Sequence, residues 1–296
     1  MNNLSHTIRK FNRFELKYLI TLQEAERVKT VLRRYLVPDE HGHNNGRYAL
    51  TSLYYDSPDY RCYQEKMAGI KFRRKLRLRR YETGGILTAE MPVFLEVKQR
   101  VDRVTQKRRA TLPYAAALHL LNDRQLVDHA PEDNAIIEEI YAFVWQYNLQ
   151  PASIVRYERQ AFIGTQYDLG LRVTFDTALT FQVHPLHLHE QPAGLPMLPP
   201  HLVVMEVKAN ERIPRWLTEL VAAQNLQLTR VSKYCRSVEA AQNMPSLAWH
   251  RLPAESAREV LSSTFSPFSS LQERMGITNQ NRNSEKKERS HGHVQH

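Results

Sequence analysis

The sequence lacks the marks of several protein classes. Its 296 residues include only two cysteines, Cys62 and Cys235, and no CxxC pair, which argues against a disulfide framework and against a cysteine-based zinc site. No segment approaches the roughly 18 consecutive apolar residues that a membrane helix needs, and the first ten residues lack the apolar core of a secretory signal. No Walker loop, GxGxxG fingerprint or Ser-His-Asp set is found, so chemistries built on those motifs have no support. We therefore expect a cytoplasmic protein without a transmembrane segment.

Positive charge is what the chain has in excess. It carries 41 Lys and Arg against 31 Asp and Glu, a formal net charge of +10, while its hydrophobic content of 42% is ordinary. Such an excess is typical of proteins that bind nucleic acid, phosphate-rich ligands or anionic membranes. Composition does not choose among these partners, and it leaves peripheral membrane association open.

Two segments depart from globular composition. From about Ser262 the chain is rich in Ser, Asn, Gln and charge, so we expect residues 246–296 to form a largely disordered tail behind a domain of residues 1–245. Residues 184–201 contain five prolines, which predicts a loop or insertion. The loop carries His184, His187, His189 and His201. A metal role for them is disfavoured because no regular structure would preorganise them.

Helical periodicity appears in segments between the strands. The apolar spacing predicts helices over Leu22–Tyr35, Pro58–Met67, Pro113–Leu121, Asp133–Tyr147, Pro214–Gln224 and Ser232–Gln242. Thr21 and Ser57 are suitable caps for two of them.

Period-2 alternation predicts strands, and their polar faces are unusually charged. In Lys71–Tyr81 the residues Lys71, Arg73, Lys75, Arg77 and Arg79 share one face. A Glu-x-Lys pattern recurs at Glu15/Lys17, Glu96/Lys98 and Glu206/Lys208. The other strands are predicted over Arg13–Tyr18, Phe94–Val101, Val104–Leu112, Ser153–Phe162, Leu171–Asp176 and Val203–Lys208.

For any single strand, a charged face that meets water is the simpler interpretation. The repetition over many strands favours another arrangement, in which helices cover the apolar faces and the charged faces turn inward. The sequence therefore predicts an α+β fold with a closed antiparallel β-barrel, a charged lumen and a covering of helices. Because like charges at this density repel one another, such a lumen is expected to bind an anion.

The residue types in the lumen indicate phosphate chemistry. Arginine suits bidentate recognition of phosphate oxygens, and lysine adds point charges. Carboxylates in the same place would repel phosphate unless they carry a divalent cation, and Mg²⁺ or Mn²⁺ held by one or two carboxylates plus phosphate oxygens fits. The matching ligand is a triphosphate or a longer phosphate chain. Phosphoryl transfer needs mainly positioning and charge neutralisation, which such a site supplies.

An ordered set of motifs resembles the VTC domain, the polyphosphate polymerase module of the vacuolar transporter chaperone complex. This domain is a member of the triphosphate tunnel metalloenzyme (CYTH-like) superfamily. The motifs are RFELKY at Arg13–Tyr18, SLYYDSPDY at Ser52–Tyr60, KLRLRRY at Lys75–Tyr81, FLEVKQR at Phe94–Arg100, VRYERQAF at Val155–Phe162, LRVTFDT at Leu171–Thr177, MEVK at Met205–Lys208 and SKYC at Ser232–Cys235. Together they span about residues 10–240, and the chain resembles the bacterial stand-alone type.

The resemblance implies functional residues. Phosphate-binding and catalytic cations would be Lys17, Arg77, Arg79, Lys98, Arg156, Arg172, Lys208 and Lys233. Lys107 or Arg108 would extend this surface, and Tyr157 would help to order it. Glu206 would be the principal metal ligand, with Glu96 and Glu15 as weaker candidates. The implied reaction transfers the γ-phosphate of ATP to a growing inorganic polyphosphate chain, with pyrophosphate as a further ligand and Mn²⁺ or Mg²⁺ as cofactor.

Alternatives remain open at this point. Tunnel hydrolases begin with ExExK, whereas Arg13 gives RxExK here, which favours the polymerase branch over a metal-dependent triphosphatase. A non-enzymatic polyphosphate-binding module is the third hypothesis, against which the inward carboxylate of Glu206 argues. Nucleic acid is not expected, because few aromatic residues interleave with the cations. Asp56 is interpreted as a structural cap, and Glu158 as an ion-pair partner of Arg156.

Overall fold

The alternating segments form one antiparallel sheet of ten strands. The computed structural model describes residues 13–82, 85–102, 104–165, 168–189, 194–210 and 212–243. All of these belong to one compact unit, Met1–Trp249. The expected tail of residues 246–296 lies outside the described residues.

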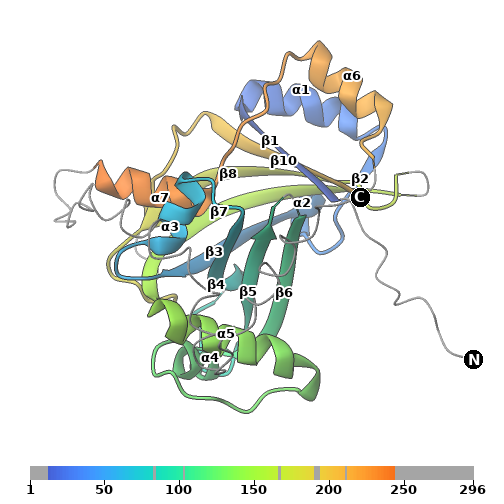
Figure 1. Cartoon of the computed structure of the whole chain (residues 1–296). Helices are drawn as coiled ribbons and strands as arrows, with labels where there is room; N and C mark the ends of the chain where they lie inside the picture. The colour runs from blue at the N-terminus through green and yellow to red at the C-terminus, as the bar shows by residue number, and fades with distance from the viewer. Residues whose placement is uncertain are drawn as a thin grey trace, which may run out of the picture. The chain divides into compact units, whose positions relative to one another are not determined.

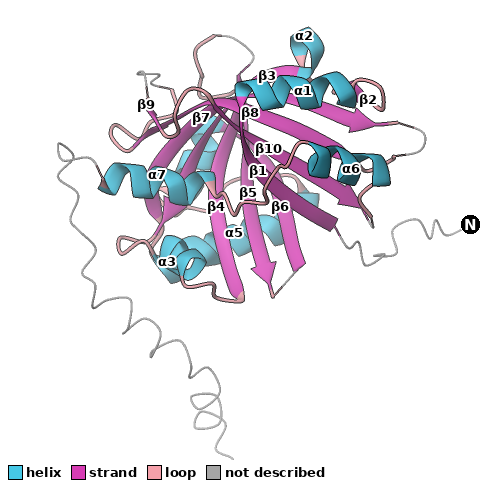
Figure 2. Ribbon diagram, turned by 90° about the horizontal axis from the view of Figure 1, so that it is seen from above, coloured by secondary structure: helices cyan, strands magenta, loops and turns pink. Residues whose placement is uncertain are grey.

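The strand order differs strongly from the order along the chain, so the first and the last strand of the described residues pair in the sheet (Figures 1 and 2). The main path runs β1 (Arg13–Thr21), β10 (Leu202–Asn210), β8 (Arg172–Gln182), β7 (Gln150–Gly164), β3 (Arg47–Asp56), β4 (Phe72–Glu82), β5 (Pro92–Val101) and β6 (Val104–Pro113). Off this path, β2 (Leu36–Pro38) pairs with β7, and β9 (Leu195–Pro196) pairs with β8.

The expectation of a closed barrel is wrong. Within the described ranges no pairing joins β1 to β6, the two ends of the path. The free edge of β1 is instead occupied by the segment that precedes the last helix. Tyr18 forms a bridge with Leu228, and the amide of Thr229 donates to the carbonyl oxygen of Lys17 at 2.8 Å. Because this segment takes the backbone groups that closure would need, the sheet stays open.

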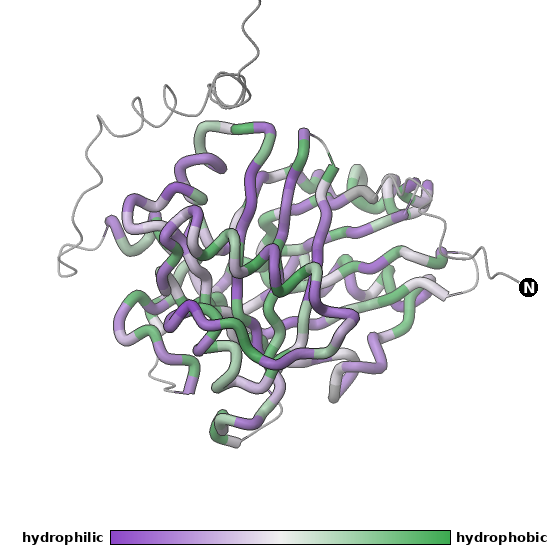
Figure 3. Tube along the Cα trace, turned by 60° about the horizontal axis from the view of Figure 1, so that its bottom comes forward, coloured by the Kyte–Doolittle hydropathy of each residue, from purple (hydrophilic) through white to green (hydrophobic). Residues whose placement is uncertain are grey.

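Helices cover the apolar face of the sheet in two places. α1 (Leu22–Leu32) and α6 (Arg215–Ala223) pack on β1, β8 and β10, while α4 (Tyr114–Leu121) and α5 (Asn134–Tyr147) pack on β4, β5 and β6. Figure 1 shows these two helix pairs on opposite sides of the fold, and Figure 3 shows the strands between them alternating between hydrophilic and hydrophobic residues. We call the helix-covered face the outer face and the opposite one the inner face.

α7 (Lys233–Gln242) breaks this scheme, because it packs on the inner face. Its Tyr234 and Val238 share a core with Leu50, Val155 and Phe181. α3 (Arg61–Met67) lies beside it, and the short helices α2 (His43–Gly46) and η2 (Pro131–Asp133) complete the elements. None of the helices in the described part of the chain has the length and apolar character needed to cross a bilayer.

The helices that the apolar spacing predicts are all present, with ends that shift by a few residues. Thr21 caps α1 in a capping box with Glu24. α3 begins at Arg61 instead of Pro58, and Ser57 accepts from the amide of Arg61 at 2.8 Å. Asp56 accepts hydrogen bonds from the amides of Ser57, Cys62 and Tyr63 and from the hydroxyl of Tyr234. Asp56 therefore joins β3, α3 and α7, which agrees with a structural role.

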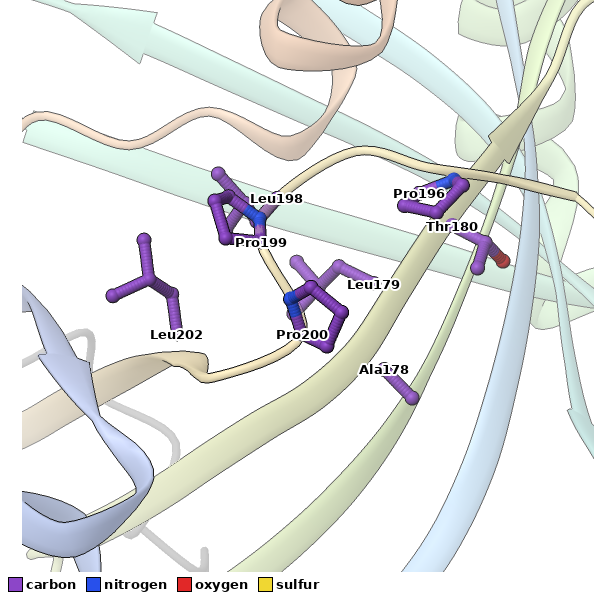
Figure 4. Close-up of a pocket in the computed structure, with 8 residues that line it drawn as sticks. All are labelled: Ala178, Leu179, Thr180, Pro196, Leu198, Pro199, Pro200 and Leu202. Carbon is purple, nitrogen blue, oxygen red and sulfur yellow. The ribbon is translucent and has the colours of Figure 1, made fainter.

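The proline-rich segment 184–201 is a loop, as expected, but its described parts are packed. Leu188 and Met197 are buried in two different cores, and β9 lies within the loop. A cavity of about 230 Å³ beside it is lined by Leu179, Thr180, Pro196, Leu198, Pro199 and Leu202 (Figure 4). This cavity has no charged lining residue and does not suit phosphate. His187 and His189 lie with ring centroids 5.4 Å apart.

Candidate functional site

The sheet register gathers charged side chains from neighbouring strands on the inner face. Arg77 of β4 lies opposite Glu96 of β5, which lies opposite Arg109 of β6. A second row lies two residues away along each strand and consists of Lys75, Lys98 and Lys107, which are opposite one another in the register. The residues between them along each strand, such as Leu76 and Val97, are buried under α4 and α5. Period-2 alternation therefore separates a helix-covered apolar face from a charged one.

Glu96 is the centre of the first group of ion pairs, which we call the Glu96 cluster. Its carboxylate is 1% exposed and contacts four cationic side chains. Arg77 Nε donates to it at 2.7 Å, Lys107 Nζ lies at 2.6 Å, Arg109 Nε donates at 2.8 Å and Arg79 Nη1 lies at 3.7 Å. One acid on β5 thus compensates cations from the two neighbouring strands, β4 and β6.

These cations keep Glu96 ionised. Burial by itself would raise the pKa of this carboxyl, but Arg77, Arg79 and Lys107 outweigh burial and hold the pKa well below its usual range. The pKa of Lys107 is lowered, because burial outweighs its attraction to Glu96. The Glu96 carboxylate is therefore a weak base.

Glu206 is the centre of the second group, the Glu206 cluster. The carboxylate receives Lys233 Nζ at 2.9 Å, Lys17 Nζ at 3.3 Å, Lys208 Nζ at 3.6 Å and Arg159 Nη2 at 3.7 Å. Burial opposes ionisation here too, but Lys17, Lys233 and Lys208 hold the pKa of Glu206 well below normal. The cations come from β1, β10, β7 and α7.

Asp176 extends the Glu206 cluster, and Tyr157 connects this cluster with the Glu96 cluster. Asp176 of β8 is fully buried and accepts a bidentate pair from Arg159, at 2.6 and 2.7 Å, together with Lys233 at 2.5 Å. Tyr157 accepts from Arg79 Nη2 at 3.1 Å, and Lys233 Nζ lies 4.7 Å from its ring centroid. The phenol therefore touches cations of both clusters.

Glu15 joins opposite parts of the open sheet. Lys98 Nζ of β5 lies 3.0 Å from its carboxylate, and Lys17 Nζ of its own strand lies at 3.3 Å. Burial would raise the pKa of Glu15, but Lys98, Lys17 and Lys208 lower it to about 2. β1 and β5 thus meet through side chains although no backbone pairing in the described residues closes the sheet.

Most of the site residues expected from the sequence come together. Lys17, Arg77, Arg79, Lys98, Lys107, Lys208, Lys233, Glu15, Glu96 and Glu206 all belong to this network. Arg172 lies on the same face, where it pairs with Asp39 at 2.5 Å and donates to Tyr48 Oη at 2.9 Å. Arg108 lies on the outer face against Glu139. Of the two residues weighed, Lys107 is the inner one.

Arg156 is the exception, because it lies on the outer face. It pairs in register with Thr51, whose hydroxyl binds Glu82, and it donates to Gln182 at 2.9 Å. Arg159, three residues on, is the inner arginine of β7. Charged residues occupy both odd and even positions of β7, so they lie on both of its faces. The alternation pattern of this strand therefore does not decide which face is the inner one. Asp176 was also not predicted from the sequence as a partner in the network, although it lies within the predicted strand Leu171–Asp176.

The carboxylates of the inner face fit a divalent cation only in company with phosphate. Of the two weaker metal-ligand candidates, Glu96 lies in a separate cluster from Glu206, the expected principal ligand. No set of three His, Cys, Asp or Glu side chains within the described ranges is placed to hold a metal. Glu15 and Glu206, however, share the ammonium of Lys17 at 3.3 Å. One or two carboxylates plus phosphate oxygens suffice for Mg²⁺ or Mn²⁺, and these two are the residues that would supply them.

Comparisons with known proteins agree with the motif set. The model of the VTC domain family matches residues 12–242. No curated protein matches the chain. Among solved structures, a proposed adenylate cyclase from Bacillus halodurans is 13% identical with a TM-score of 0.41, over 74% of this chain and 92% of that one. A Pyrococcus horikoshii protein is 12% identical with a TM-score of 0.40, over 77% and 99%. At these TM-scores the structures add nothing to the functional argument.

Replacing Glu96 by glutamine is expected to destabilise the free protein by about 3 kcal/mol, the low end for a broken buried pair, because the buried Arg79 and three partly exposed cations lose their counter-charge. Tripolyphosphate should raise the melting temperature more in Glu96→Gln than in the wild type, since phosphate oxygens would replace the lost carboxylate. Thermal unfolding with and without tripolyphosphate measures both effects. Glu219→Gln is the matched control, because Glu219 pairs with Arg215 on an exposed face of α6. An equal gain in Glu96→Gln and wild type would contradict this account.

The pH dependence of anion binding should depend on Lys208. Burial lowers the pKa of Lys208 to about 8, against the attraction of Glu206. Because phosphate binds the charged ammonium better, tripolyphosphate affinity should fall as pH rises from 7 to 9. Lys208→Arg should reduce this fall, since arginine stays protonated. Calorimetric titrations of both proteins at constant ionic strength test this. Protonation of tripolyphosphate itself changes with pH equally in both series, so it does not affect the difference between the two proteins. Identical pH profiles would refute the assignment.

Proposed function

The chain belongs to the VTC domain family, whose members bind polyphosphate or triphosphate, and from this premise we propose that it is an ATP-dependent polyphosphate polymerase. The γ-phosphate of ATP would pass to the end of an inorganic polyphosphate chain on the inner face, with a divalent cation. The bond between the γ-phosphorus and its bridging oxygen to the β-phosphate breaks, and ADP leaves. A terminal oxygen of the acceptor chain forms the new bond to the γ-phosphorus.

The observation that carries this proposal is the continuous succession of cations between the Glu96 and Glu206 clusters. On β4 alone, Arg73, Lys75, Arg77 and Arg79 occupy alternate positions of one face, so they span about 20 Å at about 3.3 Å per residue. A single phosphate would use only a small part of such a row. A chain of phosphates presents charge at every unit and matches it.

The residues supply positioning and charge neutralisation, which is most of what phosphoryl transfer requires. The arginine forks of the Glu96 cluster would bind the oxygens of the transferred phosphate, and the lysines of the Glu206 cluster would hold the neighbouring phosphates. Glu206 and Glu15 would hold the divalent cation, which neutralises charge on the phosphate oxygens. The lysines also keep the acceptor oxygen ionised, so no general base is needed.

The carboxylates of the inner face are weak bases, and this favours transfer to a phosphate acceptor over transfer to water. A triphosphatase on the same scaffold would need a group that activates water. Glu96 and Glu206 are poor candidates, because surrounding cations lower both pKa values far below neutrality. An ionised phosphate acceptor needs no such help. Hydrolysis therefore remains the second candidate function, and the products distinguish the two.

Turnover should depend on Arg159 and not on Arg156, which lies on the opposite face of the same strand. We expect Arg159→Gln to lower the rate by about 10²–10³, because a preorganised charge of the Glu206 cluster, which would hold the phosphates next to the transferred one, is lost. Arg156→Gln should stay near the wild-type rate. Purified protein with ATP and Mn²⁺ or Mg²⁺ would be followed by gel and phosphorus NMR. Long chains with ADP support the polymerase, free orthophosphate alone supports the hydrolase, and no turnover refutes both.

Long polyphosphate should bind more tightly than tripolyphosphate, because only the longer chain reaches a group of cations at one end of the inner face. Lys66, Arg73, Arg100 and Arg230 gather there, and we call them the cationic end. Burial lowers the pKa of Lys66, with Arg73 and Arg230 adding to the effect, and burial followed by Arg100 and Arg230 lowers the pKa of Arg73. The double variant Lys66→Gln/Arg230→Gln should weaken binding of long polyphosphate severalfold and reduce its salt dependence. Tripolyphosphate binding should change little, because the ligand is too short to need this end. Arg215→Gln, on exposed α6, is the control in calorimetry at two salt concentrations. Equal weakening of both ligands would refute the length dependence.

A further inference from the structure

Half-buried aromatic rings line the end of the inner face that lies opposite the cationic end. They are Tyr48 of β3, Tyr81 of β4 and Phe94 of β5, and we call them the aromatic shelf. The ring centroids of Tyr48 and Tyr81 lie 5.7 Å apart, and those of Tyr81 and Phe94 lie 5.5 Å apart at right angles. On β4 the inner face thus runs from Arg73 through Arg77 and Arg79 to Tyr81. Its two ends differ in chemistry.

Two arginines connect the aromatic shelf with the phosphate-binding network. The Arg109 guanidinium lies 4.4 Å from the ring centroid of Phe94 and donates to Tyr81 Oη at 3.3 Å. The same side chain donates to Glu96 at 2.8 Å. Arg172 donates to Tyr48 Oη at 2.9 Å. A ligand on the shelf would therefore meet aromatic faces and, immediately beside them, the first cations of the Glu96 cluster.

Aromatic residues in a fold most often fill the core, and Tyr48 and Tyr81 do rest against the core that contains α7. The shelf differs from ordinary core in two respects. Its rings are only half-buried and belong to the charged inner face, whereas the outer face of the same strands is sealed by α4 and α5. Its hydroxyls are also held by arginines instead of by backbone groups. A phosphate group gains nothing from contact with an aromatic face, whereas a nucleobase can stack on it.

We propose that the aromatic shelf binds the base of the ATP donor, which gives the inner face a direction. This inference rests on the proposed use of ATP. The adenine would stack on the face of one of the two perpendicular rings of Tyr81 and Phe94 and lie against the other ring. The triphosphate would extend past Arg109 into the Glu96 cluster. The growing phosphate chain would then run toward the cationic end, away from the departing ADP. The arrangement separates the site that recognises the donor from the site that holds the product.

The shelf is tested by comparing two ligands that share a triphosphate and differ in the nucleoside. ATP and tripolyphosphate would be titrated calorimetrically into wild type, Phe94→Leu and Tyr81→Leu in EDTA, where turnover is excluded. Loss of a stacking partner should weaken ATP binding by about 5- to 100-fold. Tripolyphosphate binding should stay within about twofold, which also shows that the variants are folded. Tyr81→Phe is the matched control, because it keeps the ring and should keep ATP affinity.

A second measurement on the wild-type protein covers the case in which a variant does not fold. Saturation-transfer NMR with ATP should show strong transfer from protein aromatic protons to the adenine protons. Absence of this transfer, or equal weakening of ATP and tripolyphosphate in the leucine variants, would overturn the shelf and leave the polymerase intact. Ring-dependent ATP binding in a protein that makes no polyphosphate would instead support the shelf and refute the proposed reaction.

Discussion

Mutual repulsion among the cations of the inner face is the constraint on which the rest of the structure depends. The register of β4, β5 and β6 brings arginines and lysines side by side, and the fold tolerates them because a few buried carboxylates lie among them. Glu96 compensates cations of two strands, and Glu206 compensates cations of three strands and one helix. Each acid therefore connects elements that are distant in sequence. The same ion pairs that permit the fold also fix the positions of the cations.

Such pairs are poor sources of stability, because desolvation offsets most of their attraction. Their value is preorganisation: the cations are already oriented and already stripped of much of their water before an anion arrives. Carboxylate oxygens in the free protein occupy places that phosphate oxygens can take. The low pKa values of Glu15, Glu96 and Glu206 keep these acids charged throughout the neutral range.

The sequence predicted the helices and the charged strands well, because amphipathic periodicity reports directly on a half-buried element. β3 was missed as a strand. Residues from Leu50 to Asp56 are all buried, so this central strand shows no alternation. The sequence assigned Arg156 to the inner face of β7, but this face carries Arg159. The error arose because the two arginines lie on opposite faces of the strand, so both faces are charged. Closure of the sheet was also mispredicted, since the competing partner of β1 is an irregular segment around Leu228 that has no strand signature.

The irregular segment around Leu228 covers the open edge of the sheet and also positions α7. An unpaired edge strand is a liability that proteins cover or charge. Here the chain before α7 covers β1, and Val231 accepts from Lys17 Nζ at 3.1 Å. Two residues later α7 begins and delivers Lys233 to Glu206 and Asp176. A closed barrel would have left α7 without this anchor on β1. The position of Lys233 therefore follows from the open edge, and the helix that would otherwise be an appendage completes the Glu206 cluster.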